Sequence, residues 1–324
     1  MRSSGVSAAL TLSLTGRYER QGADAAEGVR LWAEAAGVRL ALVDDRGSPE
    51  AALDAYSGWI GTADLLIGPY ASGLVRAVAP LVREAGRVLW NHGGSADDLA
   101  QPGVACLPAP ASSYFDGAIR EAAQLGIGRL AVVRGQGRFA RAVADGVGVR
   151  ASEHGMDISA LDGRTLEGAD VAGTALLVAG PFEHDIAVIR GLHRQGRPAT
   201  LLAAVAAGVP AFGEELGELA EGVLGPVQWW PSAGTPEVGP SGIDFVARFR
   251  RRTGREPSYP AAQAAAAGYL AHAAHGLGLV RDDVPGWATS TLLGPFALDA
   301  AWRQTGHRVT TVRWQAGRMV PVDR

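Results

Sequence analysis

Serine and glycine residues follow two apolar runs at points where they could bind an anion. One run stops at Gly68-Pro69 and is followed by Ser72, and another is followed by Gly93 and Ser95. A helix that begins after a strand presents free backbone N–H groups and a partial positive charge, which stabilise a carboxylate. A serine hydroxyl adds a donor of adjustable direction. These residues favour binding of a carboxylate or amide; the alternative is that Ser72 only caps its own helix.

The elements that must position these residues alternate between strands and helices. Apolar runs bounded by Gly, Pro and Asp predict strands, and longer runs with helical spacing predict helices. Ser48-Pro49-Glu50 predicts the start of one helix, because it supplies an N-cap, a proline at the first position and an early carboxylate. This order indicates parallel sheets with helices on both faces. The predicted strands are 10–14, 38–43, 65–67 and 87–90, and helices are predicted at 23–36 and from 48 to 59.

The second half of the chain repeats this pattern around a second Gly-Pro-aromatic sequence. Gly68-Pro69-Tyr70 ends one strand and Gly180-Pro181-Phe182 ends another, which predicts one supersecondary unit used twice; chance similarity is the alternative. Residues 225–231 read as a connection, and the end of the chain reads as a β-hairpin. The further predicted strands are 130–133, 175–178, 199–202, 309–314 and 319–322, with helices at 139–152, 186–195, 245–252 and 261–279.

Composition excludes several classes of function. The 324 residues carry a net charge of -3, so the chain has no general attraction for polyanions, and the one basic cluster, residues 248–255, reads as a solvated helix end. All 30 basic residues are Arg, which excludes a Lys-dependent P-loop or Schiff base. Cys106 is the single cysteine, so no intramolecular disulfide forms. No apolar run is long enough to predict insertion in a membrane.

Several segments together resemble the type I periplasmic binding proteins, in particular the leucine/isoleucine/valine-type receptors of ABC importers. The resemblance implies two doubly wound α/β lobes joined by three crossings, with a ligand cleft between them. Lobe 1 is expected at 1–115 plus 232–300, and lobe 2 at 116–231 plus 301–324. The segments are LTLSLTGRYERQG at 10–22, GPYASGLVRAVAPLVREAG at 68–86, WNHGGSADD at 90–98, GREPSYPAAQAAAAGYLAHA at 254–273 and LLGPFALD at 292–299.

The resemblance also implies the residues of the ligand site. Ser72, Gly93 and Ser95 are expected to hold a carboxylate and part of an α-amino group. Val205 stands where amino-acid receptors of this family place an acid, so we expect a small carboxylate or amide with an apolar or aromatic body. Gln21, in the first strand–helix loop, and His92, at the cleft mouth, complete the polar set. The aromatic candidates are Tyr18, Tyr70, Tyr114, Phe139 and Phe182.

The expected function is that of an extracytoplasmic receptor that delivers its ligand to an ABC permease, with no catalytic residue, cofactor or metal. The alternative is a cytosolic sensor of the same fold, since the N-terminus shows no convincing signal peptide. A third hypothesis is an NAD-dependent reductase, because residues 135–140 fit GxGxxA between a strand and a helix. The following strand lacks a clear ribose-binding acid at its end, with Asp157 at or before its start, so a ligand-facing loop is favoured.

Overall fold

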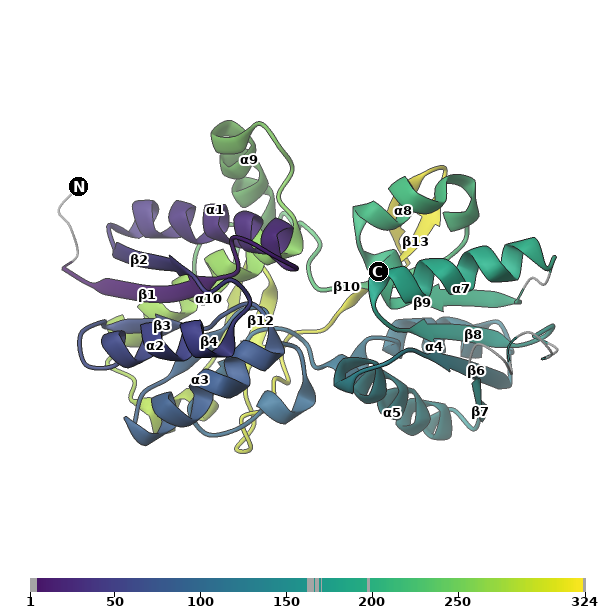
Figure 1. Ribbon diagram of the computed structural model, residues 1–324, viewed down its shortest axis with the longest axis horizontal. Helices are drawn as coiled ribbons and strands as arrows, with labels where there is room; N and C mark the ends of the chain where they lie inside the picture. The colour runs from purple at the N-terminus through teal and green to yellow at the C-terminus, as the bar shows by residue number, and fades with distance from the viewer. Residues whose placement is uncertain (1–4, 162–165, 167–168, 170, 197–198, 323–324) are drawn as a thin grey trace. The chain divides into compact units, whose positions relative to one another are not determined.

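A computed structural model describes residues 5–161, 166, 169, 171–196 and 199–322 of the chain. The chain forms two compact units (Figure 1). Unit 1 contains Met1–Ala109 and Trp229–Arg308, and unit 2 contains Pro110–Gln228 and Val309–Arg324. Among the described residues, none of the helices combines the length and apolar character that crossing a bilayer requires.

Unit 1 is built on a five-stranded parallel sheet in the order β2-β1-β3-β4-β5. The central strands are buried on both faces, as parallel sheets between helical layers require. An antiparallel hairpin packs separately, with Trp287 and Phe296 against Trp90. The strands are β1 (Ser7–Leu12), β2 (Arg39–Asp44), β3 (Leu65–Ile67), β4 (Leu89–Asn91), β5 (Val104–Cys106), β11 (Ala288–Thr291) and β12 (Gly294–Ala297).

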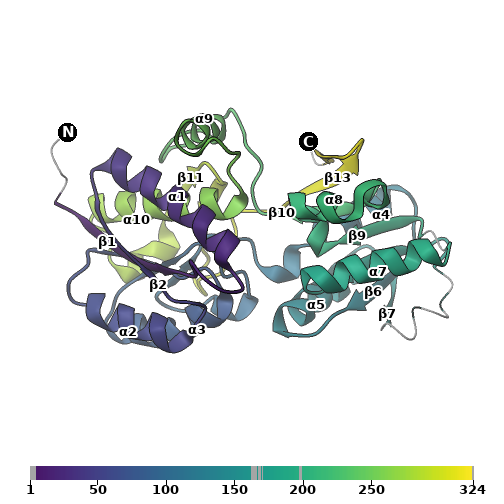
Figure 2. The ribbon, with the colours of Figure 1, turned by 45° about the horizontal axis from the view of Figure 1, so that its top comes forward.

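Helices cover both faces of the unit 1 sheet. α1 (Glu19–Ala36) and α10 (Tyr259–Gly276) lie on one face, and α2 (Pro49–Trp59) and α3 (Ser72–Glu84) lie on the other (Figures 1 and 2). The first pair packs closely because Gly28 faces the chain of α10: an added Cβ would stand 2.0 Å from the Ala261 carbonyl oxygen. The remaining helices of this unit are α9 (Gly242–Thr253) and the short 3-10 helices η1 (Asp97–Leu99) and η5 (Arg281–Gly286).

Unit 2 contains a seven-stranded sheet in the order β14-β13-β10-β9-β8-β6-β7. Its parallel part packs one core against α4 and α5 and another against α7 and α8. The strands are β6 (Arg129–Arg134), β7 (Asp157–Leu161), β8 (Ala175–Ala179), β9 (Leu201–Ala204), β10 (Leu224–Val227), β13 (Thr310–Gln315) and β14 (Arg318–Pro321). The helices are η2 (Ala111–Ser113), α4 (Asp116–Gln124), α5 (Arg138–Glu153), α7 (Phe182–Arg194), η3 (Val205–Gly208), α8 (Pro210–Leu216) and η4 (Gly217–Ala220).

The two units share one strand order. β2-β1-β3-β4-β5 of unit 1 corresponds in sequence order to β7-β6-β8-β9-β10 of unit 2. The order reverses between β1 and β3 in unit 1, and between β6 and β8 in unit 2. Ligands of open α/β sheets bind outside the carboxyl ends of the strands at such a reversal. The predicted α/β fold with two doubly wound sheets is therefore confirmed. Each unit has its own candidate ligand-binding edge of the sheet.

Some predicted boundaries are corrected. The chain passes between the units at 109–110, 228–229 and 308–309, whereas the sequence placed these crossings at 115–116, 231–232 and 300–301. Phe115 is in the core of unit 2, and the indole N–H of Trp229 donates to the Leu292 carbonyl within unit 1 at 2.9 Å. Gln304 donates to the Cys106 and Leu107 carbonyls, both at 3.2 Å, which keeps residues 301–308 in unit 1.

The segment expected to be a connection at residues 225–231 begins as part of strand β10. β10 pairs in parallel with β9 and antiparallel with β13, so it lies inside the sheet despite Pro226. Gly225 is needed there because an added Cβ would stand 2.4 Å from the carbonyl carbon of Ala207. Tertiary pairing overrides the local sequence at this strand.

Candidate functional site

Aromatic side chains gather at the carboxyl edge of the unit 1 sheet. Tyr18, from the loop after β1, lies 5.8 Å from Tyr70, after β3, between ring centroids. The Tyr70 and Tyr259 hydroxyl oxygens are 2.6 Å apart and share a hydrogen bond. The Tyr70 ring also lies 6.1 Å from the His92 ring. Tyr70 is therefore largely buried and fixes the loop, whereas Tyr18 is only partly buried.

Ser72 is the first residue of α3 and does not cap it. The N-cap is Ala71, which provides no side-chain hydrogen bond to the helix. The Ser72 hydroxyl instead accepts a hydrogen bond from the Ala96 backbone N–H at 3.3 Å, across the adjacent loop. The backbone N–H groups of the first turn of a helix have no partner within it. Here the N–H groups of the buried Leu74 and Val75 donate to the Ala71 carbonyl, at 2.9 Å and 3.1 Å. Ser72 is half-buried and Gly73 is exposed, and their N–H groups lie at the helix N-terminus, where an anion is stabilised.

Gly93 is required by the packing of this edge, and Gly94 lies close to a flexible side chain. A Cβ on Gly93 would stand 2.4 Å from the Tyr70 carbonyl oxygen, and one on Gly94 would stand 2.6 Å from the Leu99 Cδ1. Close approach of the Tyr70 backbone therefore explains Gly93 without a ligand, and the Leu99 side chain lies against Gly94. Gly93 and Ser95 are partly exposed, so their backbone and hydroxyl groups are accessible.

Asn91 organises the same loop and was not among the predicted residues. It is fully buried at the end of β4, and its Oδ1 accepts from Gly93 N–H at 3.2 Å and Gly94 N–H at 2.8 Å. Its Nδ2 donates to the Gly94 carbonyl at 2.7 Å and to the Cys106 Sγ at 3.2 Å. The amide thus fixes the positions of Gly93 and Gly94. A buried Asn at a strand end before two glycines is the sequence signal for this role.

His92 was predicted at the cleft mouth, and this placement is wrong. Its side chain is 0 % exposed, and neither ring nitrogen has a hydrogen-bond partner among the described residues. Burial lowers the pKa of His92 to about 4, so the ring is neutral at pH 7. His92 directly follows β4, and its ring packs toward Tyr70.

Gln21 lies in a helix and not in the predicted loop. α1 begins at Glu19, four residues before the predicted start, because the chain turns tightly at Gly16 and Gly22 packs against Ser13. An added Cβ on Gly22 would stand 2.0 Å from the Ser13 carbonyl oxygen. Gln21 is half-buried, and its Oε1 is buried without a partner in the described part of the chain.

The other three predicted residues lie in unit 2. Tyr114 and Phe139 form an edge-to-face pair with centroids 5.3 Å apart, and Gln228 Nε2 donates to the Tyr114 hydroxyl at 2.9 Å. Phe182 is the first residue of α7, after β8, and is partly exposed. Phe139 and Phe182 therefore follow β6 and β8, the two strands at which the order of this sheet reverses.

The sequence did not predict that His184, close to Phe182 in the chain, pairs with a buried acid. His184 Nδ1 lies 3.1 Å from Asp185 Oδ1, and Asp185 Oδ2 accepts from the Ala206 backbone N–H at 3.0 Å. Asp185 is 0 % exposed. Burial raises the pKa of Asp185 to about 6, against the opposing hydrogen bonds from His184 and the backbone of Ala206 and Gly180. A buried acid thus stands next to the Val205 segment, although Val205 itself is apolar.

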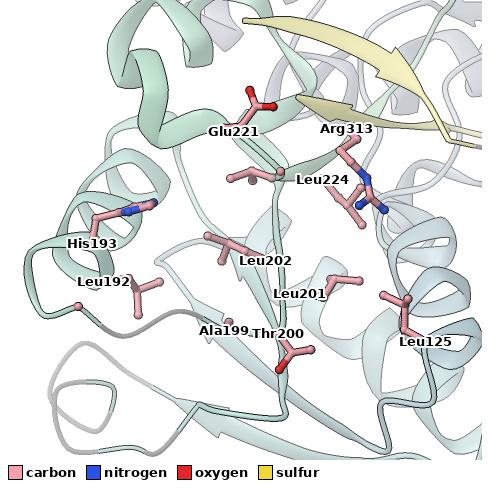
Figure 3. A pocket seen from close by; sticks show the side chains of 13 residues that line it. Leu125, Leu192, His193, Ala199, Thr200, Leu201, Leu202, Glu221, Leu224 and Arg313 are labelled. Carbon is pink, nitrogen blue, oxygen red and sulfur yellow. The ribbon is translucent and has the colours of Figure 1, made fainter. Parts of the chain in front are cut away.

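A pocket of about 440 Å³ lies elsewhere in unit 2 (Figure 3). It is lined at the amino ends of β9 and β10 by residues that include Leu201, Leu224 and Arg313. None of the ten predicted ligand residues lines it, and Arg313 is already ion-paired with Glu121. The pocket is at the opposite edge of the sheet from Phe182 and is not part of the candidate site.

Two other sequence features are explained by the structure. The basic cluster at 248–255 is largely neutralised, because Arg252 pairs with Glu27 and Glu34, each at 2.7 Å, and Arg255 pairs with Asp24 at 3.0 Å. Asp157 is the first residue of β7, at the opposite edge from the GxGxxA loop. A ribose-binding acid belongs at the carboxyl end of that strand, so Asp157 is not placed for this role, and Asp162, which follows the last residue of β7, lies outside the described residues.

Comparisons with known proteins agree with this fold. A sequence model of the periplasmic binding protein family matches residues 5–318, so the chain belongs to that family. None of the curated proteins matches it. A leucine binding protein from Thermotoga maritima has 19% identity and a TM-score of 0.77, with 98% of this chain and 97% of that chain covered.

Two solved structures with bound ligands are also similar. A solute binding protein of an ABC transporter from R. palustris in complex with benzoate has 17% identity and a TM-score of 0.76, over 98% of this chain and 95% of the other. A second, from Rhodopseudomonas palustris BisB5 in complex with 3,4-dihydroxy benzoic acid, has 15% identity and a TM-score of 0.76, over 97% and 94%. The predicted resemblance to the type I periplasmic binding proteins is confirmed.

Proposed function

We propose that this chain is an extracytoplasmic receptor that captures a small carboxylate- or amide-bearing ligand with an apolar or aromatic body and delivers it to an ABC importer. Ser72, Gly93 and Ser95 bind the carboxylate or amide at the carboxyl edge of unit 1. Tyr18 supplies an aromatic face there, with Gln21 as a further polar contact. Tyr114, Phe139 and Phe182 supply apolar contacts from unit 2.

The observation that carries this proposal is the convergence at the first turn of α3. Ser72 ties the loops after β3 and β4 together, and Asn91 holds the loop after β4 by accepting hydrogen bonds from the Gly93 and Gly94 N–H groups. The donors that remain at this edge are the hydroxyl groups of Ser72 and Ser95 and the N–H groups of Ser72 and Gly73 at the start of α3. Asp97 and Asp98 are exposed beyond Ser95, and Asp44 and Asp45 at the end of β2 already accept hydrogen bonds from Ser13, Leu14 and Thr15 in the loop after β1. A preorganised set of donors of this kind favours an anionic or carbonyl oxygen.

The similar proteins guide the choice of ligand class. Their described ligands include benzoate and 3,4-dihydroxy benzoic acid as well as branched-chain amino acids. The apolar Val205 and the aromatic side chains of unit 2 favour an aromatic carboxylate over an α-amino acid, because a buried ammonium needs a compensating acceptor.

Isothermal titration of the purified chain with benzoate, 4-hydroxybenzoate, leucine and valine tests the proposal. We expect binding of an aromatic carboxylate, and a strong loss of affinity in Ser72→Ala. Tight binding of valine together with unchanged affinity in Ser72→Ala would contradict both the ligand class and the site. Enhanced thermal stability on ligand addition provides an independent readout.

A further inference from the structure

The packing of unit 2 holds the His184–Asp185 pair in place. Gly180 and Gly135 make room for the imidazole: an added Cβ on Gly180 would stand 2.2 Å from His184 Nδ1, and one on Gly135 would stand 3.2 Å from its Cγ. The ring therefore occupies a slot between the ends of β6 and β8. Its Nδ1 edge faces the protein, where it contacts the buried Asp185 carboxylate.

The exposure of His184 must come from the opposite edge of its ring. The side chain is 29% exposed, while its Nδ1 is bonded to a carboxylate that is 0% exposed. The Nε2 and the adjacent ring carbons are thus the accessible atoms. His184 lies in the first turn of α7, directly after the reversal of strand order where ligands of α/β sheets bind.

The hydrogen bonds of Asp185 fix which His184 nitrogen carries the proton. An ionised carboxylate only accepts hydrogen bonds, so the 3.1 Å contact between His184 Nδ1 and Asp185 Oδ1 requires a proton on Nδ1. Because the pKa of Asp185 is about 6, the carboxylate predominates at pH 7.5. In its neutral form His184 carries its proton on Nδ1, and Nε2 then has a lone pair that can accept a hydrogen bond.

We infer that His184 is a specificity-determining residue whose Nε2 accepts a hydrogen bond from a donor on the body of the ligand, with Asp185 as its positioning residue. This inference rests on the proposed function, and it narrows the ligand class to carboxylates or amides that carry a hydroxyl, N–H or ammonium group. Benzoate lacks such a donor, 4-hydroxybenzoate and 3,4-dihydroxybenzoate carry hydroxyls, and leucine carries an ammonium. These probes therefore separate the possible sources of the donor.

Titration of this panel against the wild type, His184→Phe and Gly180→Ala at pH 7.5 tests the inference. Phe keeps a ring in the slot without an acceptor, and Gly180→Ala displaces the imidazole without changing it. We expect the wild type to prefer a donor-bearing ligand over benzoate by about tenfold, the effect of one hydrogen bond. Both variants should lose that preference while benzoate affinity changes less than about twofold.

The matched control is His193→Phe, because His193 is an exposed histidine at the other end of the same helix. It should retain the wild-type preference. A wild type that binds none of the panel would overturn the proposed function and this inference with it. Binding with a preference that survives in His184→Phe would overturn this inference alone.

A second measurement does not depend on a ligand. Long-range ¹H–¹⁵N correlation spectra of ¹⁵N-histidine-labelled protein at pH 7.5 should show one ring that is protonated on Nδ1 and unprotonated on Nε2. The signal is assigned by its absence in His184→Phe. Protonation of His184 on Nε2 would contradict the acceptor role.

Discussion

The Ser72 hydroxyl accepts a hydrogen bond from the Ala96 backbone N–H at 3.3 Å, which joins the loop after β3 to the loop after β4. One side chain thus fixes the relative position of the two segments that carry the proposed carboxylate contacts. The hydroxyl hydrogen is not used in this bond, so it remains available as a donor to a ligand. Ser72 therefore has a structural role beside its proposed binding role.

Ser72→Ala tests the two roles together. We expect the affinity for an aromatic carboxylate to fall by about 10-fold or more, because a hydrogen bond to a charged group contributes about 1.5–3 kcal/mol. The free energy of unfolding should fall by only about 1 kcal/mol. Titration calorimetry and urea unfolding measure these effects. Ser57→Ala is the control, since Ser57 is exposed and bonds only to the Leu53 carbonyl of its own helix; an equal loss of affinity in both variants would argue against the site.

Gly93→Ala tests the close approach of the two loops. The added Cβ would stand 2.4 Å from the Tyr70 carbonyl oxygen, so we expect a loss of about 1–3 kcal/mol in the free energy of unfolding. Gly73→Ala is the matched control. Gly73 is exposed in the first turn of α3 with no atom within 4 Å of the added Cβ, and alanine favours the helix. Thermal melting should therefore move in opposite directions for the two variants, and a parallel shift would contradict the packing described here.

The burial of His92 predicts sensitivity to acid. Its pKa falls from the unfolded value of 6.5 to about 4 in the fold, so its contribution to stability is complete above pH 6.5 and is lost as the pH falls toward 4. The loss reaches about 3 kcal/mol, at 1.36 kcal/mol per unit of pKa. His92→Leu removes this dependence and the unpartnered ring nitrogens.

Urea unfolding of His92→Leu at pH 7.5 and pH 4.5 measures the effect. We expect the variant to lose less stability than the wild type between these two pH values. His154→Leu, at an exposed position after α5, should behave as the wild type. The interpretation of His92 fails if all three proteins lose the same stability.

The stability contribution of Asp185 depends on pH in the opposite direction. Its pKa is raised from 3.8 to about 6, so the contribution of this carboxyl to stability is complete below pH 3.8 and is lost as the pH rises through 6. Asp185→Asn removes that loss. The stability of the variant relative to the wild type should therefore rise by about 2 kcal/mol between pH 4.5 and pH 7.5. A relative stability that is flat across this range, in urea unfolding, would contradict the buried ionisable group.

Local chemistry explains which elements could be predicted from the sequence. Ser48 caps α2 and Pro49 follows it as predicted, because the Ser48 hydroxyl needs only the Ala51 N–H, three residues along the chain, at 3.2 Å. β10 was missed because Gly225 and Pro226 argue locally against a strand. Its formation depends on pairing with β13, which lies far away in the sequence.

The same distinction holds for the site. The accessible Ser72, Gly93 and Ser95 follow directly from the ends of β3 and β4, and their role as ligand contacts stays a prediction. The burial of His92 depends on contacts made by Tyr70. The His184–Asp185 pair depends on the space left by Gly135 and on the hydrogen bond that the Ala206 N–H donates to Asp185. Such contacts join separate loops, and no local pattern encodes them.

The single cysteine has a practical consequence for studying this protein. Burial raises the pKa of the Cys106 thiol to about 12, and its sulfur accepts a hydrogen bond from Asn91. Thiol-reactive dyes should therefore leave the native chain unlabelled, without mutation of Cys106. Cysteines introduced at the exposed Ser57 of unit 1 and Ser152 of unit 2 would then be the sole attachment points for a donor and an acceptor fluorophore, so energy transfer between them would report ligand-dependent motion in otherwise native protein.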